Sequence, residues 1–199
     1  MERISVCRAC QSRQLKSFFD LGRQPLANSL LENQNQEEDK YPLSLSWCAN
    51  CNLVQLNHTV PPKKLFLSYV WVTGTSETAR DFAEKFYQSL ISRSPLSKKG
   101  FVLEVASNDG TFLKPFKKAG YRVLGVDPAK NIARMALKNG IPTKPWFFGA
   151  DTAKRIVDQY GFPKIIIARN VLPHVANTRD FVSGLKMCLS DQSVAAIEV

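Results

Sequence analysis

The sequence contains no long apolar run. None of its 199 residues lies in a stretch that approaches the roughly 20 consecutive apolar residues of a transmembrane helix. Residues 1–7 also lack the apolar core of a secretory signal peptide. We therefore expect a cytoplasmic protein with no membrane partner. Apolar residues at 44% and charged residues at 22% are ordinary for a globular protein, which argues against disorder.

Acidic residues are scarce, with 17 against 27 basic residues and a net charge of +10. A basic protein suits a nucleic-acid partner or an acidic small substrate. The excess is spread along the chain, however, and no basic segment with interleaved aromatic residues indicates RNA binding. Solvated helix faces account for most of the lysines, so nucleic acid is not the expected partner.

A glycine-rich dinucleotide fingerprint is also missing. Residues 102–113 pass from an apolar run through a turn of small and acidic residues into a helix, which is typical of the first β-turn-α unit of a doubly wound sheet. A dinucleotide site requires G-x-G-x-x-G there, so that the backbone can approach a pyrophosphate. Ala106, Asn108 and Thr111 occupy the three glycine positions instead.

The same turn carries two carboxylates, Glu104 and Asp109. They would repel a diphosphate and attract the ammonium and sulfonium groups of S-adenosylmethionine (SAM). We therefore predict a SAM site at residues 104–110. The expected cofactor-binding residues of the turn are Glu104, Ala106, Ser107, Asn108 and Gly110.

Asp127 ends the next predicted strand, residues 121–126. An acid at this position can accept hydrogen bonds from both hydroxyls of a cofactor ribose. Capping a helix that Pro128 opens is the structural alternative, and the two roles are compatible. We predict that Asp127 holds the ribose of SAM.

The five cysteines fall as Cys7-x-x-Cys10, Cys48-x-x-Cys51 and a lone Cys188. Two C-x-x-C pairs in a cytosolic chain predict a four-sulfur zinc site, here with 37 residues between the pairs. Iron would fit the same ligands, and a disulfide or two redox motifs are the remaining alternative. Cys188 lies on the apolar face of a predicted helix, so we expect it in the core.

We divide the chain into a zinc-binding domain (residues 1–62), an aromatic segment with a linking helix (63–96) and a Rossmann-like domain (97–199). Thr75 or Ser76 is expected to cap the linking helix, because apolar residues repeat at helical spacing after it. In the Rossmann-like domain, strands are predicted at 102–105, 121–126, 141–143, 164–169 and 194–199, and helices at 111–118, 129–138, 152–160 and 180–189.

Helical crossovers make these strands parallel, with the order 3-2-1-4-5, so the fold class is α/β. The switch point between strands 1 and 4 brings residues 168–174 beside the 104–110 turn. There we expect Phe148 to stack on the adenine and Asn170 to bind the amino-acid end of the cofactor. His174 is expected to face the open side, with a purely structural role as the alternative.

Six segments together resemble one family. The chain is similar to the zinc-containing, SAM-dependent sugar C-methyltransferases, which add a methyl branch to a nucleotide-linked keto-deoxysugar. The resemblance runs from residue 7 to the end. The segments are CRAC (7–10), PLAN (25–28), CANCNLVQ (48–55), GTS (74–76), EVASNDG (104–110) and NVLPHV (170–175).

The resemblance implies a mechanism. A base removes the proton next to the sugar ketone, and the resulting enolate carbon attacks the sulfonium methyl group. It also implies that Tyr69 and His174 lie at the substrate, which makes them the catalytic candidates. Trp71 stands where a second tyrosine is common in the family.

In that family a His/Glu pair proposed as the base follows the fifth strand, and it would lie beyond Val199. We therefore expect a shortened or partial member that binds SAM, is catalytically silent alone and self-associates through its last strand. An RNA- or protein-modifying methyltransferase with a zinc recognition module is one alternative. A non-catalytic SAM-binding module is the other.

Overall fold

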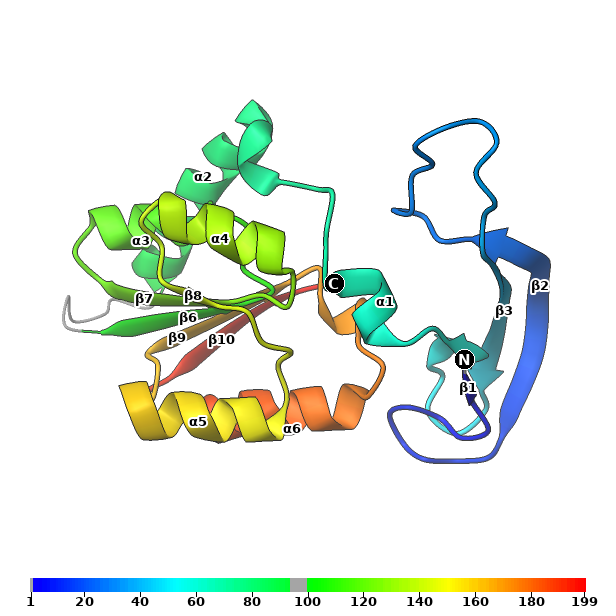
Figure 1. The fold of residues 1–199 in the computed structure, drawn as a ribbon. Coiled ribbons are helices and arrows are strands. Elements are labelled where there is room, and N and C mark those ends of the chain that lie inside the picture. Colours follow the sequence, from blue (N-terminus) through cyan, green and yellow to red (C-terminus); the bar gives the residue numbers. More distant parts are fainter. Residues whose placement is uncertain (1, 94–99) are drawn as a thin grey trace. The chain divides into compact units, whose positions relative to one another are not determined.

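The computed structural model describes residues 2–93 and 100–199. The chain divides into two compact units. The first comprises Met1–Phe66 with Ala176–Arg179, and the second comprises Leu67–Val175 with Asp180–Val199 (Figure 1). The domain boundary expected at residue 96 lies outside the described residues.

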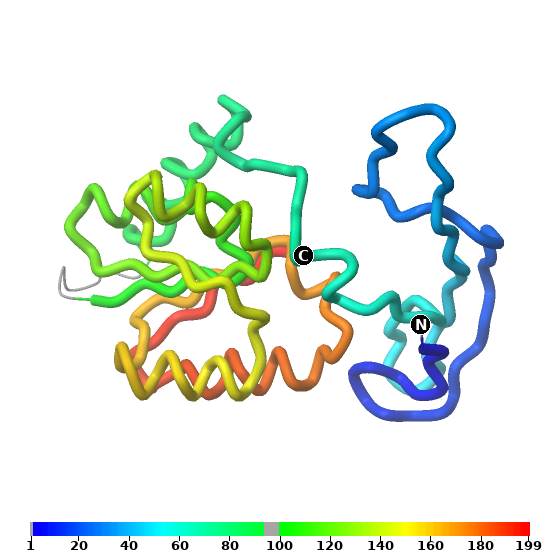
Figure 2. Tube along the Cα trace, viewed as in Figure 1, coloured from blue at the N-terminus to red at the C-terminus, as the bar shows by residue number. Residues whose placement is uncertain are grey.

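The first unit is built from short antiparallel sheets. Strand β3 is the centre of a three-stranded sheet with the order β2-β3-β4, and β1 pairs with β5. Figure 2 shows the chain doubling back between β2 and β3 through an irregular segment. The elements are β1 (Glu2–Arg3), β2 (Leu15–Pro25), β3 (Lys40–Cys48), β4 (Val54–Leu56), β5 (His58–Thr59) and α1 (Pro62–Phe66).

The central sheet of this unit buries its polar face. Ser44 and Ser46 of β3 are 7% and 4% exposed, and both contact the side chain of Asn57 through hydrogen bonds. Leu45 lies on the opposite face, where its neighbours are Phe19 of β2 and Leu56 of β4. These two neighbours are 47% and 43% exposed. Hydrogen bonds rather than an apolar core therefore hold this sheet together.

The second unit contains a five-stranded parallel sheet with the order β10-β9-β6-β7-β8. Numbered along this unit, the order reads 5-4-1-2-3, which confirms the predicted topology. β10 is an edge strand on which Ile197 is 49% exposed. The strands are β6 (Phe101–Val105), β7 (Arg122–Val126), β8 (Thr143–Lys144), β9 (Ile165–Arg169) and β10 (Val194–Glu198).

Helices cover both faces of this sheet (Figure 1). One face carries α2 (Glu77–Arg93), α3 (Lys114–Lys118) and α4 (Lys130–Lys138), and the other carries α5 (Ala150–Tyr160) and α6 (Thr178–Cys188). Ser76 caps α2, because its Oγ accepts the backbone N–H of Ala79 at 3.2 Å. Two short 3-10 turns complete the unit, η1 (Thr73–Thr75) and η2 (Leu172–His174).

Alternation along β6 divides the core into two layers. Leu103 and Val105 join the α5 and α6 side with Cys188, which is fully buried as expected. Val102 joins the α2, α3 and α4 side, where Phe116 is fully buried. Glu104 alternates onto the Val102 side, so the sheet carries a carboxyl group into this layer.

Three details of the sequence-based expectations are wrong. The helical spacing of residues 129–138 predicts that Met135 faces the core together with Ile132 and Ala136, but Met135 is 39% exposed, and Ala133 is buried in its place. The expected helix at 111–118 begins at Lys114, because residues 111–113 form a turn. The third strand starts at Thr143 rather than at residue 141.

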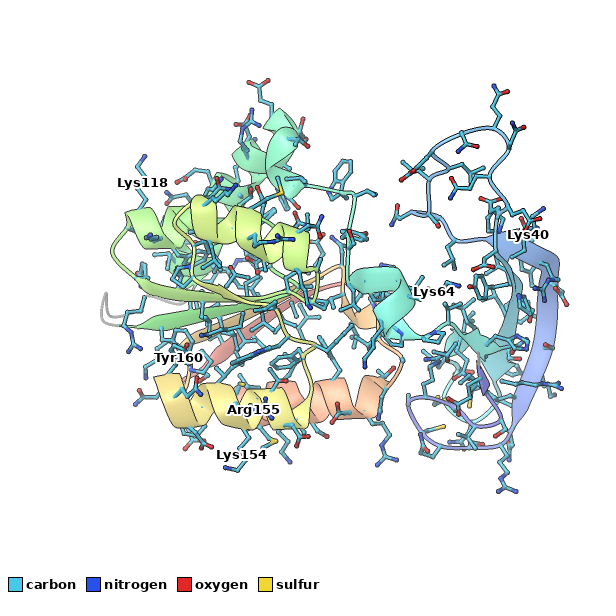
Figure 3. The ribbon with its side chains drawn as sticks, viewed as in Figure 1. Lys40, Lys64, Lys118, Lys154, Arg155 and Tyr160 are labelled. Carbon is cyan, nitrogen blue, oxygen red and sulfur yellow. The ribbon has the colours of Figure 1, made fainter. Side chains whose placement is uncertain are left out.

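Basic side chains are dispersed over the surface, as the labelled lysines and Arg155 in Figure 3 illustrate. Lys154 makes an exposed ion pair with Asp158 one helical turn away. No helix among residues 2–93 and 100–199 is both long and apolar enough to cross a bilayer.

Candidate cofactor and metal sites

The turn after β6 has an unusual backbone. Ala106, Asn108 and Gly110 all have left-handed φ angles, of 55°, 49° and 79°. The first two are the positions of the first and second glycine in a dinucleotide fingerprint. Non-glycine residues in this region cost about 1–3 kcal/mol each, and such residues cluster at ligand sites. Ala106 and Asn108 thus have the left-handed conformation that glycine would adopt easily at these two positions.

Hydrogen bonds to β7 fix this turn. The backbone N–H of Ser107 donates to the carbonyl of Val126 at 3.2 Å, and that of Asn108 donates to Asp127 Oδ2 at 2.9 Å. The Ser107 side chain packs against Gly125 of β7, where an added Cβ would lie 2.3 Å from Ser107 Oγ. The fold therefore uses Ser107 to pack the turn, and its part in cofactor binding stays a prediction.

Asp127 serves the fold with both carboxylate oxygens. Oδ2 accepts the Asn108 N–H, and Oδ1 accepts the Ala129 N–H at 2.9 Å. Burial raises the pKa of Asp127, and these two backbone hydrogen bonds oppose the rise. Ala129 rather than Asp127 is the N-cap of α4, which starts at Lys130. Each oxygen keeps a further lone pair, so ribose binding stays a compatible prediction.

Glu104 is the most perturbed acid of the site. It is 3% exposed, and its Oε2 has no hydrogen-bond partner among the described residues. Burial raises its pKa well above the ordinary value, Arg169 opposes this, and Asp109 and Asp127 reinforce it. An unpartnered carboxylate oxygen surrounded by further acids fits a positively charged ligand group.

Arg169 ends β9 and was not predicted as a site residue. Its guanidinium carbon lies 3.5 Å from the ring centre of Phe112 and 5.2 Å from those of Phe82 and Phe86. Its Nε donates to Glu198 Oε2 at 2.8 Å, and this hydrogen bond lowers the pKa of Glu198. One sequence signal could have pointed to Arg169, because a charged residue at the end of an otherwise apolar, buried strand is unusual.

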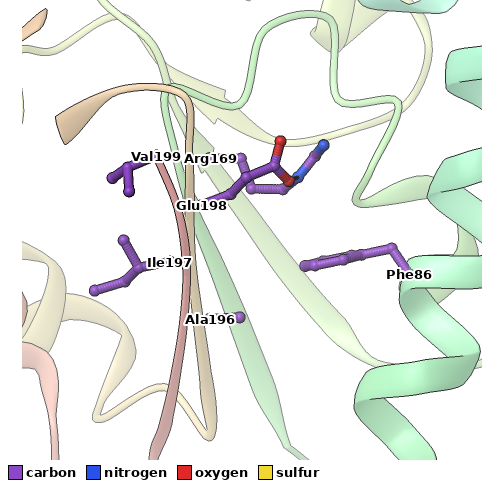
Figure 4. Close-up of a pocket in the computed structure, with 6 residues that line it drawn as sticks. All are labelled: Phe86, Arg169, Ala196, Ile197, Glu198 and Val199. Carbon is purple, nitrogen blue, oxygen red and sulfur yellow. Dashed lines mark hydrogen bonds and ion pairs between the residues drawn. The ribbon is translucent and has the colours of Figure 1, made fainter. Parts of the chain in front are cut away.

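A cavity of about 460 Å³ lies beside this ion pair (Figure 4). Phe86, Arg169 and Glu198 point into one side of it in the view, and Ala196 lies below them. Asn170 donates from Nδ2 to Glu198 Oε1 at 2.9 Å and from its backbone to the Glu198 carbonyl at 2.9 Å. The structure thus ties Asn170 to β10, and its role at the cofactor stays a prediction.

The remaining predicted site residues are Phe148, His174 and Tyr69, which lie on three different segments of the second unit. Phe148 is half-buried and packs edge-on against Phe181, with ring centres 5.4 Å apart. His174 is exposed at the end of η2. Tyr69 is half-buried, and both its backbone N–H and its carbonyl are bound by the Asn131 side chain.

The four predicted metal ligands meet in the first unit. The sulfur atoms of Cys7, Cys10, Cys48 and Cys51 all lie within 4.8 Å of one another. The Cys7–Cys51 and Cys10–Cys48 pairs are 3.5 and 3.6 Å apart. A tetrahedral zinc ion with bonds of about 2.3 Å requires sulfur atoms about 3.8 Å apart. The four sulfur atoms therefore fit one zinc ion.

Both knuckles have the same local geometry. Four residues after Cys7 and Cys48, Gln11 and Asn52 take φ angles of 63° and 64°, and each donates its backbone N–H to the carbonyl of that cysteine. A hydrogen bond with the Asn50 side chain is the main factor that lowers the pKa of the Cys10 thiol to about 6. A thiolate at neutral pH is the form that binds zinc.

Two family models match the chain. Residues 7–66 match the model described as "Putative zinc binding domain", and residues 79–199 match the model described as "Methyltransferase domain". The first match contains all four clustered cysteines, which assigns that cluster to zinc. The second contains the 104–110 turn and the whole parallel sheet.

Individual proteins agree with these matches. The chain is 29% identical to the C-methyltransferase NovU from Streptomyces niveus over 198 residues, which cover 98% of the chain and 47% of NovU. It thus spans about half the length of this curated relative. The plantazolicin methyltransferase BpumL, in complex with a pentazolic desmethylPZN analogue and SAH, is 15% identical with a TM-score of 0.50, covering 62% of this chain and 48% of BpumL.

A SAM-dependent methyltransferase from Archaeoglobus fulgidus is 17% identical with a TM-score of 0.45, covering 57% of this chain and 48% of that structure.

The strand order, the turn after β6 and the likeness to BpumL are those of the class I methyltransferase fold. Because the methyltransferase model matches residues 79–199, well over half of the sequence, the chain belongs to the methyltransferase family and carries a four-cysteine zinc-binding domain in front of the matched region.

Proposed function

We propose that this chain binds SAM at residues 104–110 and serves a C-methyltransferase that acts on a nucleotide-linked keto-deoxysugar. The observation that carries the cofactor assignment is the buried Oε2 of Glu104, which lacks a partner among the described residues at the turn after β6. The 29% identity to a C-methyltransferase supports carbon as the methylated atom. The resemblance of the six segments to sugar C-methyltransferases supports the sugar.

SAM supplies an electrophilic methyl group on a sulfonium when it is bound. Residues of this chain would position the bound SAM and stabilise its charge. Glu104 offers a carboxylate to the ligand's positive charge in a site where water is excluded. Asp127 offers the free lone pairs of its two oxygens to the ribose hydroxyls.

Carbon methylation next to a ketone also requires removal of a proton. His174 is exposed on η2, where its imidazole can accept the α-proton of a bound keto-sugar. The phenol of Tyr69 would donate a hydrogen bond to the ketone oxygen as negative charge develops on it. The zinc-binding domain would act as a folding staple, because its central sheet is held by polar contacts rather than by an apolar core.

Methyl transfer with SAM labelled in the methyl group tests this proposal. The purified chain is incubated with a panel of nucleotide-linked 4-keto-deoxysugars, and separately with RNA and with protein extracts. SAM binding without labelled product is the result expected of a chain that is catalytically silent alone. Label on a sugar carbon next to the ketone, located by NMR, would support the sugar substrate and would place the base within residues 1–199, with His174 the first residue to test. Label on RNA or protein would replace the sugar proposal.

A further inference from the structure

The segment from residue 67 to residue 73 is held by side-chain amides rather than by a neighbouring strand. Asn131 of α4 accepts the backbone N–H of Tyr69 at Oδ1, 3.1 Å, and donates from Nδ2 to the Tyr69 carbonyl, 2.8 Å. One amide thus satisfies both backbone groups of one residue, as a paired strand would do. Lys130 donates its backbone N–H to the carbonyl of Leu67 at 3.2 Å.

A second amide repeats this arrangement from the cofactor turn. Asn108 donates from Nδ2 to the carbonyl of Trp71 at 3.1 Å and accepts the backbone N–H of Thr73 at Oδ1, 2.9 Å. The bound positions, 67, 69, 71 and 73, alternate, so one edge of the segment faces α4 and the turn. We call residues 67–73 the strap.

Apolar burial contributes little to holding the strap. Leu67, Val70 and Trp71 are 39%, 57% and 56% exposed. The four hydrogen bonds from the two asparagines are therefore a large part of what orders it. The end of the strap is packed tightly, because a Cβ on Gly74 would lie 2.4 Å from Asp109 Oδ2.

Asn108 belongs to the cofactor turn, and its side chain binds the strap. Its backbone N–H is bound by Asp127, and its φ angle of 49° is part of the left-handed path of the turn. Any ligand that fixes this backbone also fixes the direction of the amide that holds Trp71 and Thr73. Asparagine is required there because the strap needs both a donor and an acceptor.

We propose that Asn108 and Asn131 are positioning residues that clamp the strap, and that Asn108 couples the order of the strap to occupancy of the cofactor turn. The coupling rests on the proposed SAM site. Binding of SAM then stabilises the strap, and by reciprocity an ordered strap strengthens SAM binding. The strap carries Tyr69 and Trp71, so the aromatic side chains are presented in their final position once the cofactor is bound.

Hydrogen–deuterium exchange of the strap amides, with and without saturating SAM, tests both parts. Asn131→Leu removes two hydrogen bonds without changing the turn, so the Tyr69 amide should exchange about tenfold faster without SAM. Asn108→Gly keeps a left-handed residue in the turn and removes the side chain that clamps the strap, together with the acceptor of the Asp109 backbone N–H. Asn35→Gly is the control, because it makes the same substitution at an exposed asparagine outside the strap and the turn.

The expected result is slower exchange of residues 69–73 in the wild type and in Asn35→Gly when SAM is added, and no slowing in Asn108→Gly at SAM concentrations at which calorimetry shows that this variant is loaded. Wild-type exchange that is unaffected by SAM, although calorimetry shows SAM bound, would overturn the coupling alone. Absence of SAM binding to the wild type would overturn the proposed cofactor site instead. Unchanged exchange in cofactor-free Asn131→Leu would overturn the clamp.

Discussion

Glu104 combines burial with an unsatisfied carboxylate oxygen, and this combination has a cost in the ligand-free protein. Its neighbours include Asp109 and Asp127, and Arg169 only partly offsets them. In the free protein the carboxyl group therefore stays protonated to a higher pH than an ordinary glutamate does. A ligand with positive charge reverses this preference, because it stabilises the carboxylate.

Binding of SAM should therefore release a proton from Glu104. Because the folded pKa is raised above 4.5, the affinity for SAM should increase as the pH rises through that pKa. The raised pKa of Glu104 also stabilises the ligand-free fold at low pH. This stabilisation is fully present below the pKa that Glu104 has in the unfolded chain, and it is lost as the pH rises through the pKa that Glu104 has in the folded protein. Glu104→Gln should bind SAM more weakly and lose both pH dependences. Calorimetry in buffers of different ionisation enthalpy measures the proton release and the affinity, and thermal melts across pH measure the stability. Equal pH profiles in the wild type and in Glu104→Gln would refute the assignment of these effects to Glu104.

Asp127 supports the turn and is predicted to support the ribose. Asp127→Ala should weaken SAM binding by about 1.5–3 kcal/mol, since charge-assisted hydrogen bonds are lost. Asp151→Ala on the exposed surface of α5 is the matched control and should bind normally. Calorimetry gives the affinities, and melting curves show how much of the loss comes from the freed N–H groups of Asn108 and Ala129. Wild-type affinity in Asp127→Ala would move the ribose contact elsewhere.

At the scale of elements, the packing of the turn against Ile141, between α4 and β8, depends on one glycine. A Cβ on Gly110 would lie 2.8 Å from three side-chain atoms of Ile141, and its φ angle is 79°. Gly120 has a φ angle of 93° and no atom within 4 Å of an added Cβ. Gly120→Ala therefore isolates the backbone strain, and Gly110→Ala adds steric overlap.

Gly110→Ala should lower the free energy of unfolding by about 2–5 kcal/mol, as strain of about 1–2 kcal/mol and overpacking of about 1–3 kcal/mol combine. Gly120→Ala should cost only the strain. Urea unfolding of both variants decides between them. Equal losses would mean that the turn yields to Ile141 and is not rigidly packed.

The zinc cluster is the element that organises the first unit. Cys48 is fully buried and ends β3, so its loss removes a zinc ligand and leaves the other three without a closed site. Purified protein should contain about one zinc per chain, and Cys48→Ser should lose it and melt at a lower temperature. Cys188→Ser is the control and should keep its zinc. Unchanged melting after replacement of all four ligands would contradict a stabilising metal site.

Elements with a strong periodic signal could be predicted from the sequence. The buried strand at Ile165–Arg169 and the acidic turn at residues 104–110 follow from local composition, and the strand order follows from right-handed crossovers. β2 was not predicted, because most of its side chains are exposed and no apolar alternation marks it. The two cysteine pairs predicted the metal cluster from spacing alone.

Contacts between distant side chains could not be predicted in this way. The Arg169 guanidinium against Phe112 and the Asn131 amide on Tyr69 join residues 57 and 62 positions apart, and nothing local signals such pairs. Asn108 was expected to bind the cofactor, whereas its side chain binds the strap. The sequence thus located the turn, and the structure added how its side chains are used.

At the scale of the whole molecule, the chain joins a zinc-stabilised unit to a methyltransferase unit. Its net charge of +10 contrasts with the acids gathered at the turn after β6. A nucleic acid or a diphosphate would meet favourable charge over the surface and unfavourable charge at the turn. Self-association through the exposed edge of β10 stays a prediction.

Competition between SAM and NAD⁺ tests the central claim most directly. The acids at the turn and the missing glycines predict that one SAM binds per chain with measurable heat. They also predict that NAD⁺, whose pyrophosphate would face Glu104 and Asp109, neither binds nor displaces SAM. Isothermal titration of the zinc-loaded protein with each ligand, followed by SAM titration in the presence of NAD⁺, measures this. Tight NAD⁺ binding that excludes SAM would contradict the account.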